Sequence, residues 1–235
     1  MTEENSESQS QTRGNTERKY LTVGLALFLG LAVSSCRIQC FSWDLPVTLW
    51  LQSLTLPGFE ELMIWVSLPG NGVWLPYALV LAVYVAFLLS GKRREAECGL
   101  ISAAGGVLLS SICKWVVGRP RPSADVVKVW AMIPNESFPS GHVVNYLTFY
   151  GFLFCLATWK IPNRLPRATL QLVLGALILL VGPSRIFLGA HWASDVIGGY
   201  LLGAVWLYLS IQIYGRYKNT AAIADAQKTQ CNDGR

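Results

Sequence analysis

The sequence has few charged residues and very few histidines. Only 14% of its 235 residues are Asp, Glu, Lys or Arg, against about a quarter in a typical soluble domain. It has two histidines, and it lacks the His-x3-His or Cys-x2-Cys pairs and the membrane-depth carboxylate clusters that would predict a metal site. The chain is 52% hydrophobic, with its apolar residues gathered in blocks. These features exclude an ordinary soluble domain and predict an integral membrane protein.

Six apolar blocks approach the length of roughly 20 residues that a helix needs to cross a bilayer. They cover about residues 21–36, 73–90, 99–117, 142–159, 170–188 and 193–214. The runs are continuous instead of alternating, which favours helices over strands. We therefore predict one all-α domain, residues 20–215, built as a bundle of six transmembrane helices. The aromatic-rich stretch 41–54 is too polar to span and predicts a short interfacial helix after the first span.

Polar segments at both ends of the chain, residues 1–19 and 216–235, lack apolar periodicity and are predicted to be disordered tails. Basic residues favour the cytoplasmic side of a membrane. With six spans, four basic segments fall on one side, which places both termini in the cytoplasm. They lie before the first span, between spans two and three, between spans four and five, and after span six.

Five cations break this charge rule, because the same topology places them on the opposite side of the membrane, close to both histidines. They are Lys114, Arg119, Arg121, Lys128 and Arg185. Their gathering predicts a cationic pocket on the extracytoplasmic face.

The first of three clusters at this face is K-W-V-V-G-R-P-R-P, residues 114–122. Lys114 and Arg121 are seven residues apart, close to two helical turns, so both are expected to point the same way. Pro120 and Pro122 stiffen the chain around Arg121, and a fixed guanidinium suits a phosphate, which it grips with two bonds. The alternative is a snorkelling lysine at a basic membrane border.

The second cluster is S-F-P-S-G-H, residues 137–142, which opens the fourth span. Ser140 is a natural helix N-cap, and Gly141 lets an anion approach the backbone closely. The free N–H groups at a helix start attract phosphate, and His142 would sit beside them. An ordinary capped helix with an interfacial histidine is the alternative.

The third cluster is S-R-I-F-L-G-A-H-W-A-S-D, residues 184–195. His191 and Asp195 are four residues apart and would share one face of a helix. A carboxylate bonded to one ring nitrogen fixes the tautomer and makes the other nitrogen a better nucleophile or base, while Arg185 supplies another anion-binding fork. A purely structural His–Asp pair is the alternative, but three clusters on three spans and one face favour a functional site.

Together the three clusters, Lys-x6-Arg-Pro, Pro-Ser-Gly-His and Ser-Arg-x5-His-x3-Asp, resemble the signature of the type 2 phosphatidic acid phosphatase (PAP2) superfamily, with every motif position present. The resemblance covers about residues 43–214. It implies a metal-independent phosphatase that works through a phosphohistidine, with no cofactor. By position, His191 is the nucleophile, Asp195 orients it, and His142 is the general acid. The residues that would bind the phosphoryl oxygens are Lys114, Arg121, Ser140, Gly141 and Arg185.

This family implies a lipid phosphate or diphosphate as substrate, in the plasma membrane and with the site facing outside. Phosphatidic acid, phosphatidylglycerol phosphate and undecaprenyl diphosphate all remain open, as does the oligomeric state, and nothing indicates a nucleic-acid partner. A vanadate-binding haloperoxidase shares the motifs, but that class is soluble. A non-catalytic anion-binding membrane protein would have little use for the His191–Asp195 pair. Cys36 and Cys40 lie close enough in sequence to pair, and Cys36 also ends a stretch similar to a lipoprotein cleavage site.

Overall fold

The structure, a computed structural model, describes residues 3–72, 74–130 and 133–233, with side chains described between residues 15 and 217. Within these ranges the chain is helical and contains no strand, which confirms the all-α prediction. The longer helices are α1 (Glu3–Ser35), α4 (Trp74–Leu89), α5 (Arg93–Val117), α7 (Gly151–Lys160), α8 (Arg164–Phe187) and α9 (Ala193–Asp233). The short elements are α2 (Asp44–Gln52), α3 (Phe59–Ser67), the 3-10 turn η1 (Leu68–Gly70), α6 (Gly141–Asn145) and the π-helical turn η2 (Tyr146–Tyr150).

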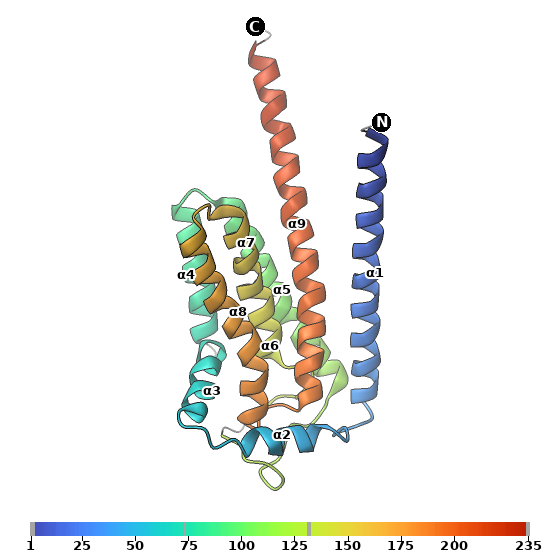
Figure 1. Cartoon of the computed structure of the whole chain (residues 1–235), viewed down its shortest axis with the longest axis vertical. Coiled ribbons are helices and arrows are strands. Elements are labelled where there is room, and N and C mark those ends of the chain that lie inside the picture. The colour runs from blue at the N-terminus through green and yellow to red at the C-terminus, as the bar shows by residue number, and fades with distance from the viewer. Residues whose placement is uncertain (1–2, 73, 131–132, 234–235) are drawn as a thin grey trace.

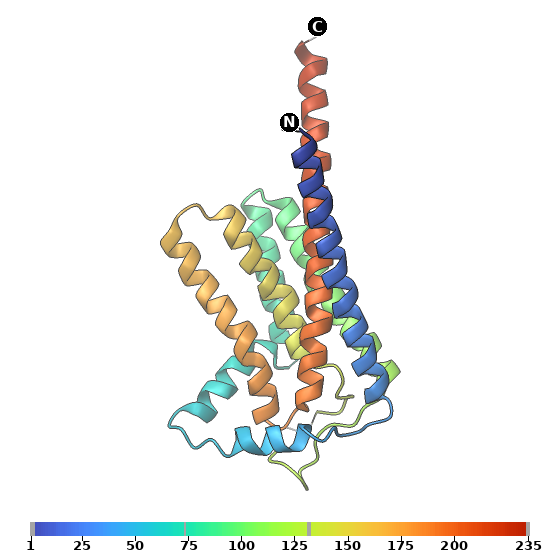
Figure 2. The ribbon, with the colours of Figure 1, turned by 45° about the vertical axis from the view of Figure 1, so that its right-hand side comes forward.

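The long helices run side by side, and α2 lies across one end of the bundle (Figure 1). Helix α9 packs against α1 and α5, α4 packs against α5, and α7 packs against α8. The beginning of α1 and the end of α9 lie at the end of the bundle opposite to α2, together with the α4–α5 and α7–α8 connections (Figures 1 and 2). The basic segments of the sequence therefore share one end of the molecule.

Fewer spans stand out in the structure than the sequence predicts. Among the described residues, three helices are long and apolar enough to cross a membrane, namely α5, α8 and residues 193–217 of α9. The pair formed by residues 59–70 and α4, bent by 63°, would count as a fourth. Helix α4 has 16 residues, about 24 Å at 1.5 Å per residue, against a hydrocarbon core of about 30 Å. The predicted span 142–159 is divided into α6, η2 and α7, so the count of six is not confirmed.

The outer surface of the bundle is apolar, as a lipid-facing surface must be. Large side chains that are mostly exposed include Trp74 (83%), Leu89 (84%) and Leu165 (78%). In water such a surface would drive aggregation. With the apolar length of α5, α8 and α9, it indicates a multi-pass membrane protein.

One helix differs from expectation, because the sequence did not predict α3. Helix α3 was missed because it is short, and it begins directly after Gly58, whose φ of 77° suits glycine. Its buried Met63 and Val66 are three residues apart and so lie on one face, toward α8. A helix is present within residues 41–54, as expected, and is α2; its interfacial position stays a prediction.

The end helices α1 and α9 extend into the segments predicted to be disordered, from Glu3 and to Asp233 respectively. Extension of an existing helix is favoured because each added residue gains one hydrogen bond without a new nucleation step. Cys36 and Cys40 are both free thiols.

Candidate functional site

The site is built at the α2 end of the bundle, where α5 stops. Gly118 adopts a left-handed φ of 62° and its N–H bonds the Lys114 carbonyl, which ends the helix. Arg121 therefore lies beyond α5, and the expectation that it shares a helical face with Lys114 is wrong. The two cations nevertheless meet, because the chain turns back after Gly118. Lys114 Nζ donates to the carbonyls of Glu136 (2.5 Å) and Ser137 (3.3 Å).

Arg121 is held by a set of backbone and side-chain acceptors. Its Nε donates to the Asn135 carbonyl (2.7 Å), and its Nη2 donates to Asn135 Oδ1 (2.5 Å). Its Nη1 bonds the Ala190 carbonyl (2.5 Å) and lies 3.1 Å from His191 Nε2. Burial lowers the pKa of Arg121 to about 10, which leaves it protonated at neutral pH. The guanidinium therefore stands fixed and charged beside the predicted nucleophile.

His191 lies in the turn before α9, with 2% of its surface exposed. Since the helix begins at Ala193, His191 and Asp195 do not share a helical face as the spacing predicted. Their contact forms differently, because Asp195 folds back over the helix start. Asp195 Oδ2 accepts the N–H of Trp192 (2.9 Å) and lies 3.6 Å from His191 Nδ1. Ser137 Oγ, 2.5 Å from the same oxygen, completes this arrangement.

These contacts define the tautomer of His191. Arginine has no acceptor, so Arg121 can only donate to Nε2, and the neutral ring carries its proton on Nδ1 facing Asp195. Burial lowers the pKa of His191 well below its ordinary value, and the Arg121, Lys114 and Arg185 cations lower it further. The ring is therefore neutral at physiological pH, with the Nε2 lone pair directed toward the cations.

His142 stands on the other side of the site and is held by a segment that carries no motif. Its Nε2 lies 3.0 Å from Asn71 Oδ1, in the loop after η1. Arg185 reaches the same loop, since its Nη1 donates to Ser67 Oγ (2.5 Å) and approaches Asn71 Oδ1 (3.4 Å). Gly70 lies in close contact with the imidazole, so that a Cβ added at this position would lie only 2.5 Å from His142 Cδ2.

Two buried polar atoms near these residues have no hydrogen-bond partner, Ser140 Oγ and Arg185 Nε. Ser140 directly precedes α6, as predicted for an N-cap, but its hydroxyl does not bond the helix start. Gly141 lies against Lys114, whose Cε would be 3.7 Å from an added Cβ. An unpartnered buried donor is costly, and an anion between these groups would satisfy both atoms.

Behind Asp195 lies a buried ionic network, in which the sequence predicted Arg119 only as part of the cationic pocket and gave Asp44 no role in the site. Arg119, 1% exposed, bonds Asp195 Oδ1 (2.5 Å) through Nη1 and Asp44 Oδ2 (2.8 Å) through Nη2. Ser194 bridges the two sides, because its Oγ accepts from Arg119 (2.7 Å) and its N–H donates to Asp44 Oδ1 (2.8 Å).

The structure thus brings the eight predicted site residues to one end of the bundle. Of the five cations that broke the charge rule, Lys114, Arg121 and Arg185 line the site and Arg119 lies behind it. Lys128 is exposed and lies over the Trp130 ring, 5.3 Å from its centroid. The sequence did contain a signal for Arg119, since it lies inside the first cluster.

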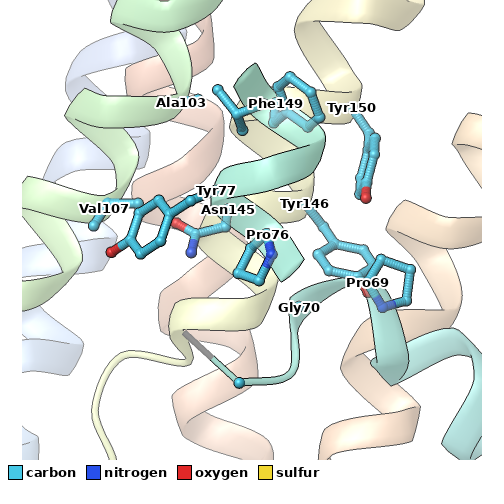
Figure 3. A pocket seen from close by; sticks show the side chains of 12 residues that line it. Pro69, Gly70, Pro76, Tyr77, Ala103, Val107, Asn145, Tyr146, Phe149 and Tyr150 are labelled. Atoms are coloured by element: carbon cyan, nitrogen blue, oxygen red, sulfur yellow. The ribbon is translucent and has the colours of Figure 1, made fainter. Parts of the chain in front are cut away.

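Two hollows lie near the two histidines. One, of about 330 Å³, is lined by Arg121 and Ala190 beside His191, together with loop residues. The other, of about 210 Å³, lies behind Gly70 and Tyr146, which both contact His142. Figure 3 shows Tyr77 and Val107 at one side of this second hollow and the rings of Tyr146 and Tyr150 at the other. Its lining is aromatic and aliphatic, and the buried Asn145 Oδ1 there has no partner.

Comparisons with known proteins agree with this geometry. The chain matches the PAP2 superfamily over residues 97–218, just over half of its length. An undecaprenyl-diphosphatase from Sulfolobus acidocaldarius is 29% identical over 170 residues, covering 69% of this chain and 72% of the relative. Phosphatidylglycerophosphatase B from Bacillus subtilis is 26% identical over 197 residues, covering 81% and 93%.

A solved structure shares the fold. The crystal structure of a transmembrane PAP2 type phosphatidylglycerolphosphate phosphatase from Bacillus subtilis gives a TM-score of 0.71 at 23% identity, over 83% of this chain and 96% of that one. The fold and the three clusters together define a membrane phosphatase. The chain belongs to the PAP2 superfamily, as its motifs predict. The roles of the individual site residues stay predictions.

Proposed function

We propose that this protein is an integral-membrane phosphatase that removes phosphate from a lipid phosphate or lipid diphosphate through a phosphohistidine on His191. The observation that carries the proposal is the state of His191. Its Nε2 is unprotonated and accepts from Arg121, its Nδ1 faces Asp195, and burial together with three cations lowers its pKa. Phosphoryl transfer depends mainly on positioning and charge stabilisation, and the cations Lys114, Arg121 and Arg185 supply both without requiring a metal ion.

In the first step His191 Nε2 attacks phosphorus, and the bond from phosphorus to the leaving oxygen breaks. His142 donates its proton to that oxygen, which leaves as an alcohol or as a lipid monophosphate. Asp195 stabilises the positive charge that the phosphorylated ring acquires. In the second step water attacks phosphorus, His142 accepts a proton from it, the P–N bond breaks, and inorganic phosphate is released.

The hollow beside His142 is suited to the apolar side of the leaving group. It is lined mostly by aromatic and aliphatic side chains, and its wall includes Gly70 and Tyr146, which contact the predicted proton donor His142. The apolar chain of a lipid leaving group would pack against this lining, whereas a sugar or nucleoside would place polar groups against it. Relatives named for undecaprenyl diphosphate and phosphatidylglycerol phosphate support a lipid substrate of this kind.

The proposal includes a site on the extracytoplasmic face of the plasma membrane, six spans and cytoplasmic termini. Its support is the charge distribution, because the α4–α5 and α7–α8 connections lie at the end opposite to the site (Figure 1). Those connections carry Lys92, Arg164 and other basic residues that favour the cytoplasmic side.

The test is phosphate release by detergent-purified protein in the presence of EDTA. Phosphatidic acid, phosphatidylglycerol phosphate and undecaprenyl diphosphate are compared, each with the wild type and with His191→Ala. Release that persists in EDTA and disappears in the variant is the expected result, and the relative rates rank the lipids. Binding of vanadate without release from any lipid would contradict the proposal and indicate an anion-binding protein.

A further inference from the structure

The ionic network behind Asp195 joins the predicted interfacial helix to the site. Asp44, the first residue of α2, is fully buried, and its carboxylate accepts from Phe41 N (2.9 Å), Arg119 Nη2 and the Ser194 backbone. Arg119 Nε also donates to the Gln39 carbonyl (3.1 Å), and its guanidinium lies 5.2 Å from the centre of the Phe41 ring. The segment that leads into α2 is therefore fastened around the cation that bonds Asp195.

Stability alone is a weak explanation for these buried ions. Removing three charged groups from water costs a large desolvation free energy, and apolar residues of similar volume often stabilise a fold equally well. Nor does the network bind the phosphate directly, because Arg119 points to the side of Asp195 away from His191. Asp195 Oδ1 takes Arg119, while Oδ2 is the oxygen that faces His191 Nδ1.

The charge balance of the network gives Asp44 a specific effect. Two carboxylates and one guanidinium leave one net negative charge. If Arg119 were bonded to Asp195 alone, its positive charge would cancel most of the attraction that Asp195 exerts on His191. Asp44 shares the guanidinium, so Arg119 holds Asp195 rigidly without cancelling its charge. The three groups together keep one net negative charge beside the ring.

We propose that Asp44 and Arg119 are positioning residues for the reaction, which fix Asp195 against His191 and preserve the negative charge of Asp195. The packed position of α2, which carries Asp44, would then control the reactivity of His191. This inference rests on the proposed function. The predicted effect is on kcat, because the network supports the charge that develops on His191 and touches neither the phosphate cations nor the hollow beside His142.

The experiment compares Asp44→Asn with a matched control, Glu95→Gln. Asp44→Asn keeps the shape and removes one charge. Glu95 is also buried and paired with a cation, Lys160, and it bonds Tyr214. It lies in the first turn of α5, at the opposite end of the helix from Lys114, so loss of its charge tests general destabilisation. Steady-state kcat and KM for phosphatidic acid and the melting temperature are measured for each protein.

Asp44→Asn is expected to lower kcat about 10- to 100-fold, by analogy with metal sites, where loss of the hydrogen-bond partner that orients a ligand costs that much. KM should change less than threefold, and Glu95→Gln should keep wild-type kcat. An unchanged kcat in folded Asp44→Asn would overturn the inference, as would an equal loss in Glu95→Gln.

Ser194→Ala serves if Asp44→Asn does not fold, because it removes one bond from Arg119 and one from Asp44 while both charges remain. A smaller fall in kcat at constant KM supports the inference, and an unchanged kcat refutes it. His191→Ala separates this result from the proposed function. If wild-type release requires His191 while Asp44→Asn is fully active, only the positioning role fails.

Discussion

The contact between Gly70 and His142 allows a direct test of the proton-donor role. In Gly70→Ala the new Cβ would lie 2.5 Å from His142 Cδ2 and 2.9 Å from Nε2, against about 3.5–4 Å for an ordinary contact. The imidazole must therefore move by about 1 Å. The backbone itself accepts alanine, because Gly70 has no positive φ.

A misplacement of about 1 Å costs about 100-fold in rate, and general acid catalysis as a whole contributes about 10²–10⁴. Gly70→Ala should therefore lower kcat about 100-fold for a lipid phosphate, whose alkoxide is a poor leaving group. The loss should be less than tenfold for 4-nitrophenyl phosphate, whose phenolate leaves without a proton.

The assay is phosphate release from both substrates, with Gly30→Ala as control, since an added Cβ there meets nothing within 4 Å. Equal losses on the two substrates would refute the reasoning, because they would show damage that does not depend on protonation of the leaving group. Unchanged activity on the lipid would refute it as well.

Three further predictions concern the pH profile, the second hollow and a strained loop. Because burial and three cations lower the pKa of His191, its unprotonated form persists as pH falls, so wild-type kcat/KM should decline only below about pH 6.5, the ordinary histidine pKa. Arg121→Gln removes one cation and should move this decline to higher pH, whereas a wild-type midpoint above 6.5 would contradict the lowered pKa. Ala103→Phe projects a ring into the hollow beside Gly70 and Tyr146. It should raise KM about tenfold, or 1.4 kcal/mol, for a long-chain lipid phosphate but not for a short-chain ester. Equal changes in both KM values would argue against lipid binding in this hollow. Gly189→Ala places a Cβ 2.0 Å from the Lys128 carbonyl at a φ of +64° and should destabilise the fold by at least about 1–2 kcal/mol, measured as a lower melting temperature in detergent; an unchanged melting temperature would show that the loop relaxes freely.

Local motifs allowed the sequence to predict which residues gather, but not how they are held. Lys114 and Arg121 were expected on one helix, yet the left-handed Gly118 ends α5 between them. They converge because a tertiary fold returns residues 135–137 to both. The same holds for His191, which meets Asp195 through a turn instead of a helical face.

Partners far away in sequence left no signal that spacing rules can detect. Asp44 bonds Ser194 across 150 positions, and Asn71 reaches His142 across 71. Asp44 looked like an ordinary residue of an interfacial helix, and Asn71 like part of a turn. Only packing of α2 and α3 against α8 and α9 brings these groups to the site. The count of six spans stays a prediction, since a π-helical turn interrupts the apolar run 142–159.

The two hollows near the histidines would give the two products of the proposed reaction separate places to leave from. Phosphate would leave past Arg121 into water, while the freed lipid would move past Tyr77 into the bilayer. Each product would then inhibit the reaction from a different phase, phosphate from the aqueous solution and the lipid from the membrane. Added phosphate competes according to its concentration in solution, and added lipid alcohol according to its surface density in the membrane. Under the proposed function, turnover would therefore respond to membrane composition and to dissolved phosphate as two independent variables.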